Sequence, residues 1–354
     1  MANLSVIGAG AWGTALSIHA SRAGHQVTLW AFEPDVAAEI DRDHRNSTFL
    51  PGVDLPAGIL ASADLGVALR DAEHVILVVP SQHVRGVAAR MAPYVGPDAV
   101  VVVAAKGIEE DSLKLMSEVI AEVMPEVGPD RRAFLSGPSF AAEVARGLPA
   151  DVVVASDRGV AARRLQPFLH AGMFRVYAGE DPIGVQVGGA LKNIIAIAAG
   201  ACDGMGLGDN ARAGLITRGL AEITRLGVAL GANPLTFLGL AGVGDLILTC
   251  TGELSRNRTL GKKLAEGVHA ADYLAHRRSV AEGFTTAAAA HELARRLDVQ
   301  MPITEQVFHV LHRGRPVRDA FQLLVAREFK DELVGLEAFL ELRAPRSPHD
   351  AGLR

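Results

Sequence analysis

The chain of 354 residues contains very little cysteine. Its two cysteines, Cys202 and Cys250, exclude a disulfide framework and a four-cysteine metal site, and no metal site is predicted. Such sparse use of cysteine favours a reducing, cytoplasmic compartment. Long apolar runs are also absent: the longest, residues 194–202, is far shorter than the ~20 residues that span a bilayer. Because no basic segment precedes an apolar one at the N-terminus, the sequence predicts neither a signal peptide nor a membrane span.

Positive charge is not in excess either. The formal net charge is −5, the pI is about 6.2, and no long basic run occurs, which disfavours a nucleic-acid-binding protein. Hydrophobic residues make up 49% of the chain, enough for a sizeable core. The length suggests two domains or one large one.

The first half of the sequence alternates short apolar runs with helical patterns. Runs such as "VILVV", "AVVVVAA" and "DVVVA" are continuous, which indicates strands buried on both faces, as in a parallel sheet covered by helices. The alternation is typical of βαβ units. Strands are predicted over residues 4–7, 26–30, 74–79, 99–104, 133–136, 151–155 and 173–177, and helices over 12–22, 34–42, 81–91, 112–123 and 158–169.

The pattern changes after about Pro182, beyond which no strand is predicted. Helices are predicted over residues 183–202, 211–231, 258–265, 285–297, 303–313 and 317–330. We therefore expect an α/β, Rossmann-like N-terminal domain with a parallel sheet over residues 1–182 and an all-α domain over 183–342. The polar tail, residues 343–354, is predicted to be disordered.

The stretch "LSVIGAGAWGTAL" carries a G-x-G-x-x-G motif between the first predicted strand and helix. In a dinucleotide site, Gly8 permits the tight turn, Gly10 lets a pyrophosphate approach the backbone, and Gly13 lets helix and strand pack closely. The helix N-terminus then faces the phosphates. The alternative is a glycine-rich turn that binds nothing.

Glu33 follows the second predicted strand, twenty residues after Gly13. A carboxylate there accepts hydrogen bonds from the adenosine ribose and repels a 2′-phosphate, which favours NAD(H) over NADP(H). Alternatively, Glu33 is only a solvated residue at the start of the next helix, because Pro34 follows it.

The stretch "VQVGGALKNIIAIAAG" is nearly all apolar or small, yet Lys192 and Asn193 lie near its middle. Burying an uncompensated lysine costs several kcal/mol, and desolvation lowers its pKa towards neutrality, as a general acid or base requires. The alternative is a lysine whose ammonium reaches solvent above a buried stem.

Further polar groups occur at places where a ligand could bind. Asp245 lies between glycine-rich and apolar flanks, and "SRNR" (Ser255 to Arg258) combines two guanidiniums with a hydroxyl and an amide, as anion sites do. Lys106 and "SGPSF" follow predicted strands, at the sheet edge where ligands of open α/β sheets bind. The alternatives are an exposed basic turn for "SRNR" and an ordinary helix start, capped by Ser139, for "SGPSF".

The blocks "GAGAWGTAL", "AAKGIE", "SGPSFAAEV", "GVQVGGALKNIIAIAAG", "GLITRGLAEITRLG", "GVGDLILTCT", "SRNR", "AEGF" and "MPIT" occur in this order. Together they resemble the bacterial-type NAD(P)-dependent glycerol-3-phosphate dehydrogenases over nearly the whole chain. The resemblance implies reversible reduction of dihydroxyacetone phosphate to sn-glycerol 3-phosphate for phospholipid synthesis, in the cytoplasm and plausibly as a homodimer.

The resemblance also implies roles for particular residues. Lys192 is implied as the general acid/base, with Asn193 orienting it. The substrate site is implied to comprise Lys106, Gly137, Ser139, Lys192, Asp245, Ser255, Arg256 and Asn257. Cofactor contacts are implied for Ala11, Trp12, Phe32, Lys106, Ala141, Arg256, Val280 and Glu282, beside Gly8, Gly10, Gly13 and Glu33. Many relatives carry Arg or His where this chain has Phe32, which puts the usual NADP preference in doubt.

Two other functions share part of this pattern. A dehydrogenase of the 6-phosphogluconate or β-hydroxyacid type also combines a Rossmann domain, a helical domain and a catalytic lysine, but the adjacent "KN" and the "SRNR" block argue against it. A dinucleotide-sensing protein without catalysis would keep the three glycines but would not need Lys192, Asp245 and Arg256 together.

Overall fold

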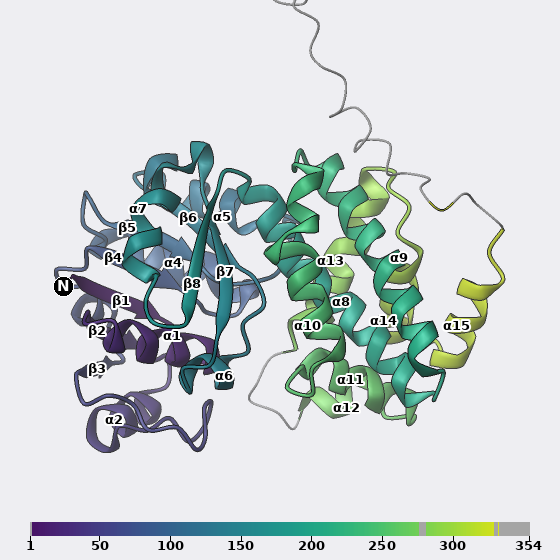
Figure 1. The fold of residues 1–354 in the computed structure, drawn as a ribbon, viewed down its shortest axis with the longest axis horizontal. Helices are drawn as coiled ribbons and strands as arrows, with labels where there is room; N and C mark the ends of the chain where they lie inside the picture. The colour runs from purple at the N-terminus through teal and green to yellow at the C-terminus, as the bar shows by residue number, and fades with distance from the viewer. Residues whose placement is uncertain (1, 276–280, 329–331, 333–354) are drawn as a thin grey trace, which may run out of the picture.

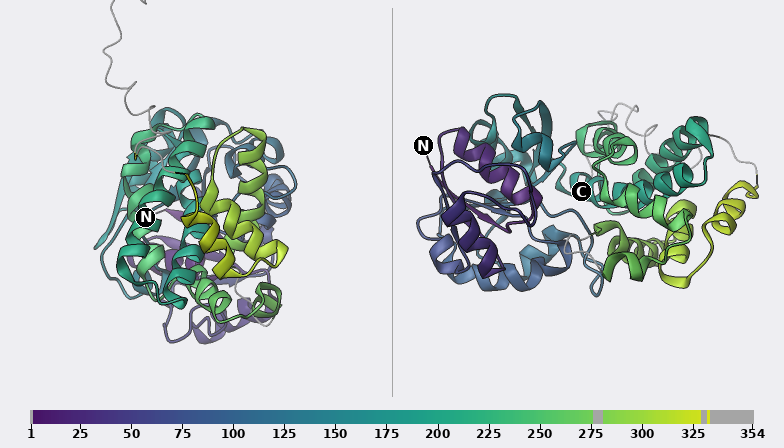
Figure 2. Two further views of the ribbon diagram at one scale, coloured as in Figure 1. Left: turned by 90° about the vertical axis from the view of Figure 1, so that its right-hand side faces the viewer. Right: turned by 90° about the horizontal axis from the view of Figure 1, so that it is seen from below.

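The computed structural model describes residues 2–275, 281–328 and 332. Its N-terminal part is a twisted sheet with helices on both faces, and its C-terminal part is a bundle of helices beside the sheet (Figures 1 and 2). This is the α/β-plus-α architecture predicted from the sequence. The predicted tail, residues 343–354, lies outside the described residues.

Eight strands form one sheet in the order β3-β2-β1-β4-β5-β6-β7-β8. They are β1 (Asn3–Ile7), β2 (Gln26–Trp30), β3 (Ile59–Ser62), β4 (His74–Leu77), β5 (Val100–Val103), β6 (Arg132–Ser136), β7 (Ala150–Ala155) and β8 (Phe174–Gly179). All seven predicted strands are present, and β3 was missed. The sheet is parallel, as predicted, except at one pair, where β7 runs antiparallel to β6.

The helices of this part are α1 (Ala11–Arg22), α2 (Pro34–Asp43), α3 (Leu65–Ala68), α4 (Val84–Met91), α5 (Met116–Val123), α6 (Ala141–Ala145) and α7 (Val160–Leu169). Three of the predicted helices begin later than expected. Leu113 and Arg158 have positive φ angles of 60° and 54°, a conformation that an α-helix cannot contain, so α5 and α7 start after them. Residues 81–83 form a separate 3-10 turn before α4.

The C-terminal part comprises α8 (Pro182–Gly204), α9 (Gly208–Ala229), α10 (Asp245–Thr251), α11 (Arg256–Ala265), α12 (Ala270–Ala275), α13 (Glu282–Arg296), α14 (Pro302–Arg313) and α15 (Val317–Val325). Among the described residues no strand follows Gly179. Helix α10 was not predicted, and α15 ends at Val325 rather than near residue 330. Strand β8 ends at Gly179 and helix α8 begins at Pro182, which supports a domain division near residue 182. This division stays a prediction.

Helix α8 is the central helix of the bundle. By length and composition it could cross a membrane, but 89% of its most apolar window is buried inside the protein, as in the core helix of a globular fold. Helix α11 crosses it at van der Waals contact of the two backbones. A Cβ atom on Gly200 would lie 1.9 Å from the Arg258 carbonyl oxygen, and one on Gly261 would lie 1.9 Å from the Ile197 carbonyl oxygen. Only glycine therefore fits at these two positions.

A buried carboxylate joins α9 to α14. Glu222 is 1% exposed and accepts hydrogen bonds from the backbone N–H groups of Ile303 (2.6 Å) and Thr304 (3.0 Å) and from the Thr304 hydroxyl (3.0 Å). These donors lie in the first turn of α14, where backbone N–H groups have no partner within the helix. Burial raises the pKa of Glu222 to about 7, although the three donors oppose that shift.

We expect Glu222→Gln to lower the free energy of unfolding by about 1–3 kcal/mol, because its amide NH2 must face one of the two backbone N–H groups and leave it unpaired. Urea unfolding at pH 7.5 measures the change. Glu305→Gln is the control, because this carboxylate on α14 is half exposed. Equal midpoints for the two variants would contradict a capping role for Glu222.

The same variant tests the raised pKa of Glu222. A carboxyl group whose pKa is higher in the folded than in the unfolded protein stabilises the fold at low pH and loses that contribution as pH rises from about 4.5 through about 7. The loss of stability over this range is therefore expected to be smaller in Glu222→Gln than in the native chain.

Candidate functional site

The glycine-rich turn after β1 has the geometry that a dinucleotide site requires. Gly8 has a φ angle of +124°, and a Cβ on it would lie 3.0 Å from the backbone of Val78. A Cβ on Gly13 would lie 1.9 Å from the Gly8 carbonyl oxygen, so α1 packs directly on the turn. A Cβ on Gly10 would meet nothing within 4 Å, which leaves open space beside the start of α1. The turn is therefore shaped to accept phosphates at a helix N-terminus.

Two side chains next to this turn also suit the binding of a dinucleotide. Asn46 is fully buried and donates hydrogen bonds to the Ala9 carbonyl oxygen and the Thr14 hydroxyl, both at 2.8 Å, which holds the turn against α1. Sequence reasoning missed Asn46, because no motif marks it. At the start of α1, beside Ala11, the indole Nε1 of Trp12 is buried without a hydrogen-bond partner among the described residues. These residues fit a bound dinucleotide.

The end of β2 is followed by an aromatic and an acidic side chain, and Arg90 of α4 lies over the Trp30 ring at 5.9 Å. Phe32 is 69% exposed, and Glu33 is the N-cap residue of α2 without a side-chain capping bond. The two arginines close in sequence are paired elsewhere: Arg42 with Asp43 at 2.6 Å and Arg45 with Asp54 at 2.7 Å. A 2′-phosphate bound here would meet a carboxylate and a phenyl ring.

Lysine and aspartate side chains meet where the sheet contacts the bundle. Lys106, just beyond β5, donates to Asp245 Oδ2 at 2.8 Å and to the Gly137 carbonyl oxygen at 3.2 Å. Lys192 of α8 donates to Asp245 Oδ1 at 2.5 Å. Helix α8 can approach the strand ends because residue 189 is glycine: a Cβ there would lie 2.7 Å from Ser136 Oγ. One carboxylate of α10 thus bridges two ammonium groups.

The electrostatics of this cluster favour proton transfer by Lys192. Burial lowers the pKa of Lys192 to about 8, with Lys106 adding to the effect and Asp245 opposing it. Burial acts to raise the pKa of Asp245, but the two lysines outweigh it and hold the pKa below its usual value. Asp245 therefore remains a carboxylate while Lys192 titrates near neutrality.

Thr249 completes the surroundings of Lys192. Its hydroxyl accepts a hydrogen bond from Lys192 Nζ at 2.9 Å and donates to the Asp245 carbonyl oxygen at 2.6 Å. Sequence reasoning missed Thr249, although its spacing of four from Asp245 would have indicated it once α10 was recognised. Asn193 does not orient Lys192. Its side chain bonds to the Gly189 carbonyl oxygen (3.4 Å) and to Asn257 Nδ2 (2.9 Å), which corrects that expectation.

The "SGPSF" segment follows β6 and borders the lysine cluster. The Gly137 carbonyl oxygen accepts from both Lys106 Nζ and the Ser139 hydroxyl, the latter at 3.0 Å. Ser139 does not cap the next helix, whose N-cap residue is Phe140 and whose first residue is Ala141. The alternative of a simple helix cap is therefore wrong, and Ser139 lies partly exposed beside Lys106.

Three of the four "SRNR" side chains bond to the protein itself. The Ser255 hydroxyl accepts from the Arg258 N–H at 3.2 Å and caps α11. Asn257 donates to Asn193 and accepts from the Gly283 N–H at 3.1 Å, which ties α8, α11 and α13 together. Arg258 pairs with Asp203 at 2.7 Å and with Glu253 at 2.6 Å. The alternative of an exposed basic turn is wrong for these residues.

Arg256 differs from its neighbours. It makes no hydrogen bond or ion pair with any described residue, and its side chain stays accessible to solvent at the first position of α11. Crowding by the surrounding protein lowers its pKa through desolvation, with Glu282 opposing the shift. A free guanidinium at a helix N-terminus is a suitable anion site.

Glu282 connects the bundle to the sheet. It begins α13 and accepts hydrogen bonds from the Ser81 N–H at 3.1 Å and the Ser81 hydroxyl at 2.6 Å, just beyond β4. Burial raises the pKa of Glu282. Val280, the other residue predicted here, lies outside the described residues. Among the described residues, no cluster of three or more His, Cys, Asp or Glu side chains could hold a metal.

Comparison with known proteins gives one consistent family. Residues 3–162 match the family model described as NAD-dependent glycerol-3-phosphate dehydrogenase N-terminus, and residues 181–322 match the model of its C-terminus. The glycerol-3-phosphate dehydrogenase [NAD(P)+] of Geobacter sp. (strain M21) is 49% identical over 329 residues, which cover 93% of this chain and 98% of that one. The enzyme of the same name from Syntrophobacter fumaroxidans is 51% identical over 330 residues, or 93% and 97% of the two chains.

A solved structure agrees with these matches. The crystal structure of glycerol-3-phosphate dehydrogenase from Coxiella burnetii superposes with a TM-score of 0.87 at 38% identity, covering 92% of this chain and 99% of that one. The arrangement of sheet and bundle therefore belongs to a known enzyme architecture. The chain is a member of the NAD-dependent glycerol-3-phosphate dehydrogenase family.

Proposed function

We propose that the protein reduces dihydroxyacetone phosphate reversibly to sn-glycerol 3-phosphate, with Lys192 as the general acid/base. The observation that carries this assignment is the buried Lys192 ammonium, held by Asp245 at 2.5 Å and by Thr249 at 2.9 Å. A reduced nicotinamide, when bound, supplies the hydride for C2 of the substrate. The residues of the chain supply the proton, the orientation and the binding of the phosphate.

Lys192 is suited to give a proton to the C2 oxygen as negative charge develops on it. In the reductive direction, Lys192 starts as the ammonium and ends neutral, and its pKa of about 8 makes both states accessible. Asp245 keeps its charge throughout, so Lys106 and Lys192 remain oriented. Thr249 fixes the position of the Lys192 nitrogen.

Arg256 is proposed to bind the substrate phosphate. It is the "SRNR" side chain without a protein partner among the described residues, and it stands at the start of α11, where backbone N–H groups favour an anion. Ser255 and Asn257 then support this site indirectly, because the Ser255 hydroxyl caps α11 and the Asn257 amide ties α11 to α8.

The cofactor is proposed to lie along the carboxyl ends of β1, β4 and β5. Gly8, Gly10 and the start of α1 would hold its pyrophosphate, with Ala11 and Trp12 beside it. Lys106, Ala141, Arg256 and Glu282 border the same edge. The paired state of Arg42 and Arg45 supports the preference for NAD(H), because neither is free for a 2′-phosphate.

Cytoplasmic location, supply of glycerol 3-phosphate for phospholipid synthesis and a homodimeric state are proposed from the family resemblance alone. The first fits the two cysteines, both of which are free and buried.

Lys192→Ala is expected to lower kcat by about 10²–10⁴-fold and to leave cofactor binding nearly intact, because the lost interaction belongs to the transition state. Lys262→Ala, which removes a partly exposed lysine of α11, is the control. In the native enzyme, kcat for reduction should fall as pH rises through about 8, and kcat for oxidation should rise. A Lys192→Ala enzyme within tenfold of native kcat would remove this residue from the chemistry.

Arg256→Ala is expected to raise KM for dihydroxyacetone phosphate about 10–100-fold, because a hydrogen-bonded charge pair contributes about 1.5–3 kcal/mol. Arg256→Lys should recover only part of the loss, since a point charge cannot replace the guanidinium fork. Steady-state kinetics measure both variants, and Arg295→Ala, at an exposed position of α13, is the control. An unchanged KM would show that Arg256 does not contact the phosphate.

The native enzyme is expected to have a kcat/KM for NADH at least equal to that for NADPH. Repulsion by Glu33 weakens the binding of a 2′-phosphate by about 1–2 kcal/mol after screening by solvent and salt, or roughly five- to thirtyfold in affinity. The double variant Phe32→Arg/Glu33→Ser should shift the ratio towards NADPH. A native preference for NADPH above tenfold would mean that another cation binds the 2′-phosphate.

A further inference from the structure

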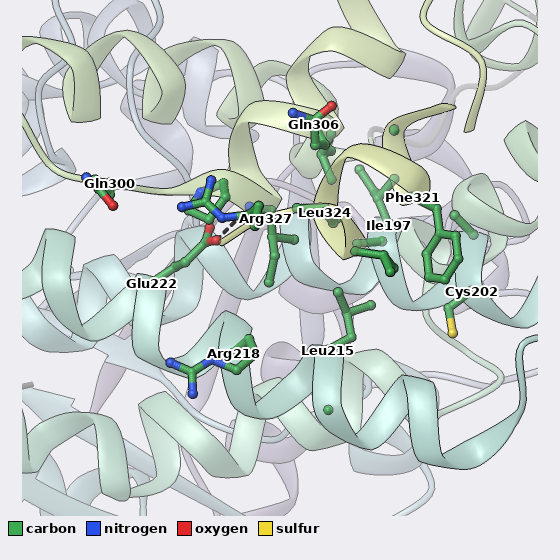
Figure 3. A pocket seen from close by; sticks show the side chains of 18 of the residues that line it. Ile197, Cys202, Leu215, Arg218, Glu222, Gln300, Gln306, Phe321, Leu324 and Arg327 are labelled. Atoms are coloured by element: carbon green, nitrogen blue, oxygen red, sulfur yellow. Dashed lines mark hydrogen bonds between the residues drawn. The ribbon is translucent and has the colours of Figure 1, made fainter. Parts of the chain in front are cut away.

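A large apolar groove lies in the helical bundle, away from the lysine cluster. Its volume is about 1100 Å³, above the range of about 300–1,000 Å³ typical of small-molecule sites. Helices α8, α9, α14 and α15 line it, and Figure 3 shows Leu215, Phe321 and Leu324 around it with the thiol of Cys202 at one end. The dehydrogenase chemistry proposed above makes no use of this groove.

Helix α15 forms one wall of the groove and is poorly covered. On the groove side of α15, Ala320 is buried, Phe321 and Leu324 are half-buried, and Val325 is 67% exposed. An amphipathic helix normally buries its apolar stripe against a neighbour. Val317 and Leu324 pack against the core of the bundle, so the groove side of α15 is only partly covered by the described residues.

The chain itself leads into this groove. Glu332 lines it, and its carbonyl oxygen accepts a hydrogen bond from Arg218 Nη1 of α9 at 3.0 Å. The next residues, 333–342, read "LVGLEAFLEL". On a helix, Leu333, Leu336, Phe339 and Leu340 would share one face, with Glu337 and Glu341 on another. Ten helical residues span ~15 Å, enough to run along the groove from Arg218.

This segment is an addition relative to known family members. The match to the Geobacter sp. enzyme covers 329 of the 354 residues yet 98% of that enzyme, which leaves 25 residues of this chain outside it. Because the N-terminal family model begins at residue 3 and the C-terminal one ends at residue 322, the surplus lies mainly at the C-terminus.

We propose that residues 333–342 of the same chain dock into the groove as an amphipathic helix, with their leucine and phenylalanine face against α8, α9 and α15. The charges agree with this placement. Arg218 and Arg225 are seven residues apart on α9 and line the groove with Arg327; Arg218 also bonds to the Glu332 carbonyl oxygen and Arg225 to that of Gln300. In the proposed placement, Glu337 and Glu341 pair with these cations. The proposal is independent of the catalytic assignment.

Cys202 provides the test, because it is a free thiol that lines the groove. Leu340→Cys in the full-length chain is expected to form a disulfide with Cys202 under mild oxidation, at least tenfold faster than the matched control Glu341→Cys on the acidic face. The product should be monomeric on non-reducing gels, form at a rate independent of protein concentration, and disappear when Cys202→Ser is added. Peptide mass mapping identifies the linked pair.

Other outcomes would overturn the proposal. Equal rates for the two cysteine variants would show that the segment has no preferred face towards the groove. Disulfide-linked dimers that form faster at higher protein concentration would assign the groove to a second copy of the chain.

A second measurement does not depend on the cysteine variants. Deletion of residues 333–354 should speed backbone hydrogen exchange in α15 and the adjoining face of α9 at least tenfold, while exchange in β4 and β5 stays unchanged. Unaltered exchange in α15 and α9 would also overturn the proposal.

Discussion

The buried carboxylate of Asp245 between two lysine ammoniums is the interaction on which the architecture of the site depends. Lys106 comes from the sheet, Lys192 from α8 and Asp245 from α10, so the cluster exists only when both parts of the chain are folded against each other. One negative charge cannot fully compensate two positive ones in a dehydrated site. Burial keeps the pKa of Lys192 low enough for proton transfer; Asp245 opposes this effect and Lys106 adds to it.

Most of the fold follows from local patterns, and the exceptions have identifiable physical causes. Strand β3 has only four residues at the sheet edge, with Leu60 60% exposed, so its sequence lacks the continuous apolar run of the inner strands. The direction of β7 was missed because a strand buried on both faces has the same apolar pattern whether it runs parallel or antiparallel. The apolar pattern of a strand indicates that it is buried, whereas the chain segment that connects it to the preceding strand determines its direction in the sheet.

The residue types of the candidate site could be predicted from the sequence, but only some of the contacts between these residues could be. Lys192, Asp245 and Lys106 were identified, and the structure brings them together. Asn193 was misread because adjacent residues on a helix point about 100° apart, so it faces α11 while Lys192 faces α10. In "SRNR", the sequence shows four side chains that could bind an anion. It does not show that helix capping, contacts between helices and ion pairs occupy three of them.

The glycines of this protein meet two different structural requirements. At positions 200 and 261 the fold itself demands glycine, because any side chain would penetrate the neighbouring helix backbone. At position 10 the backbone angles, φ −64° and ψ 174°, suit any residue, and an added methyl group would meet nothing. The fold therefore requires glycine at the first two positions, whereas at position 10 the missing side chain leaves space that the polypeptide itself does not fill.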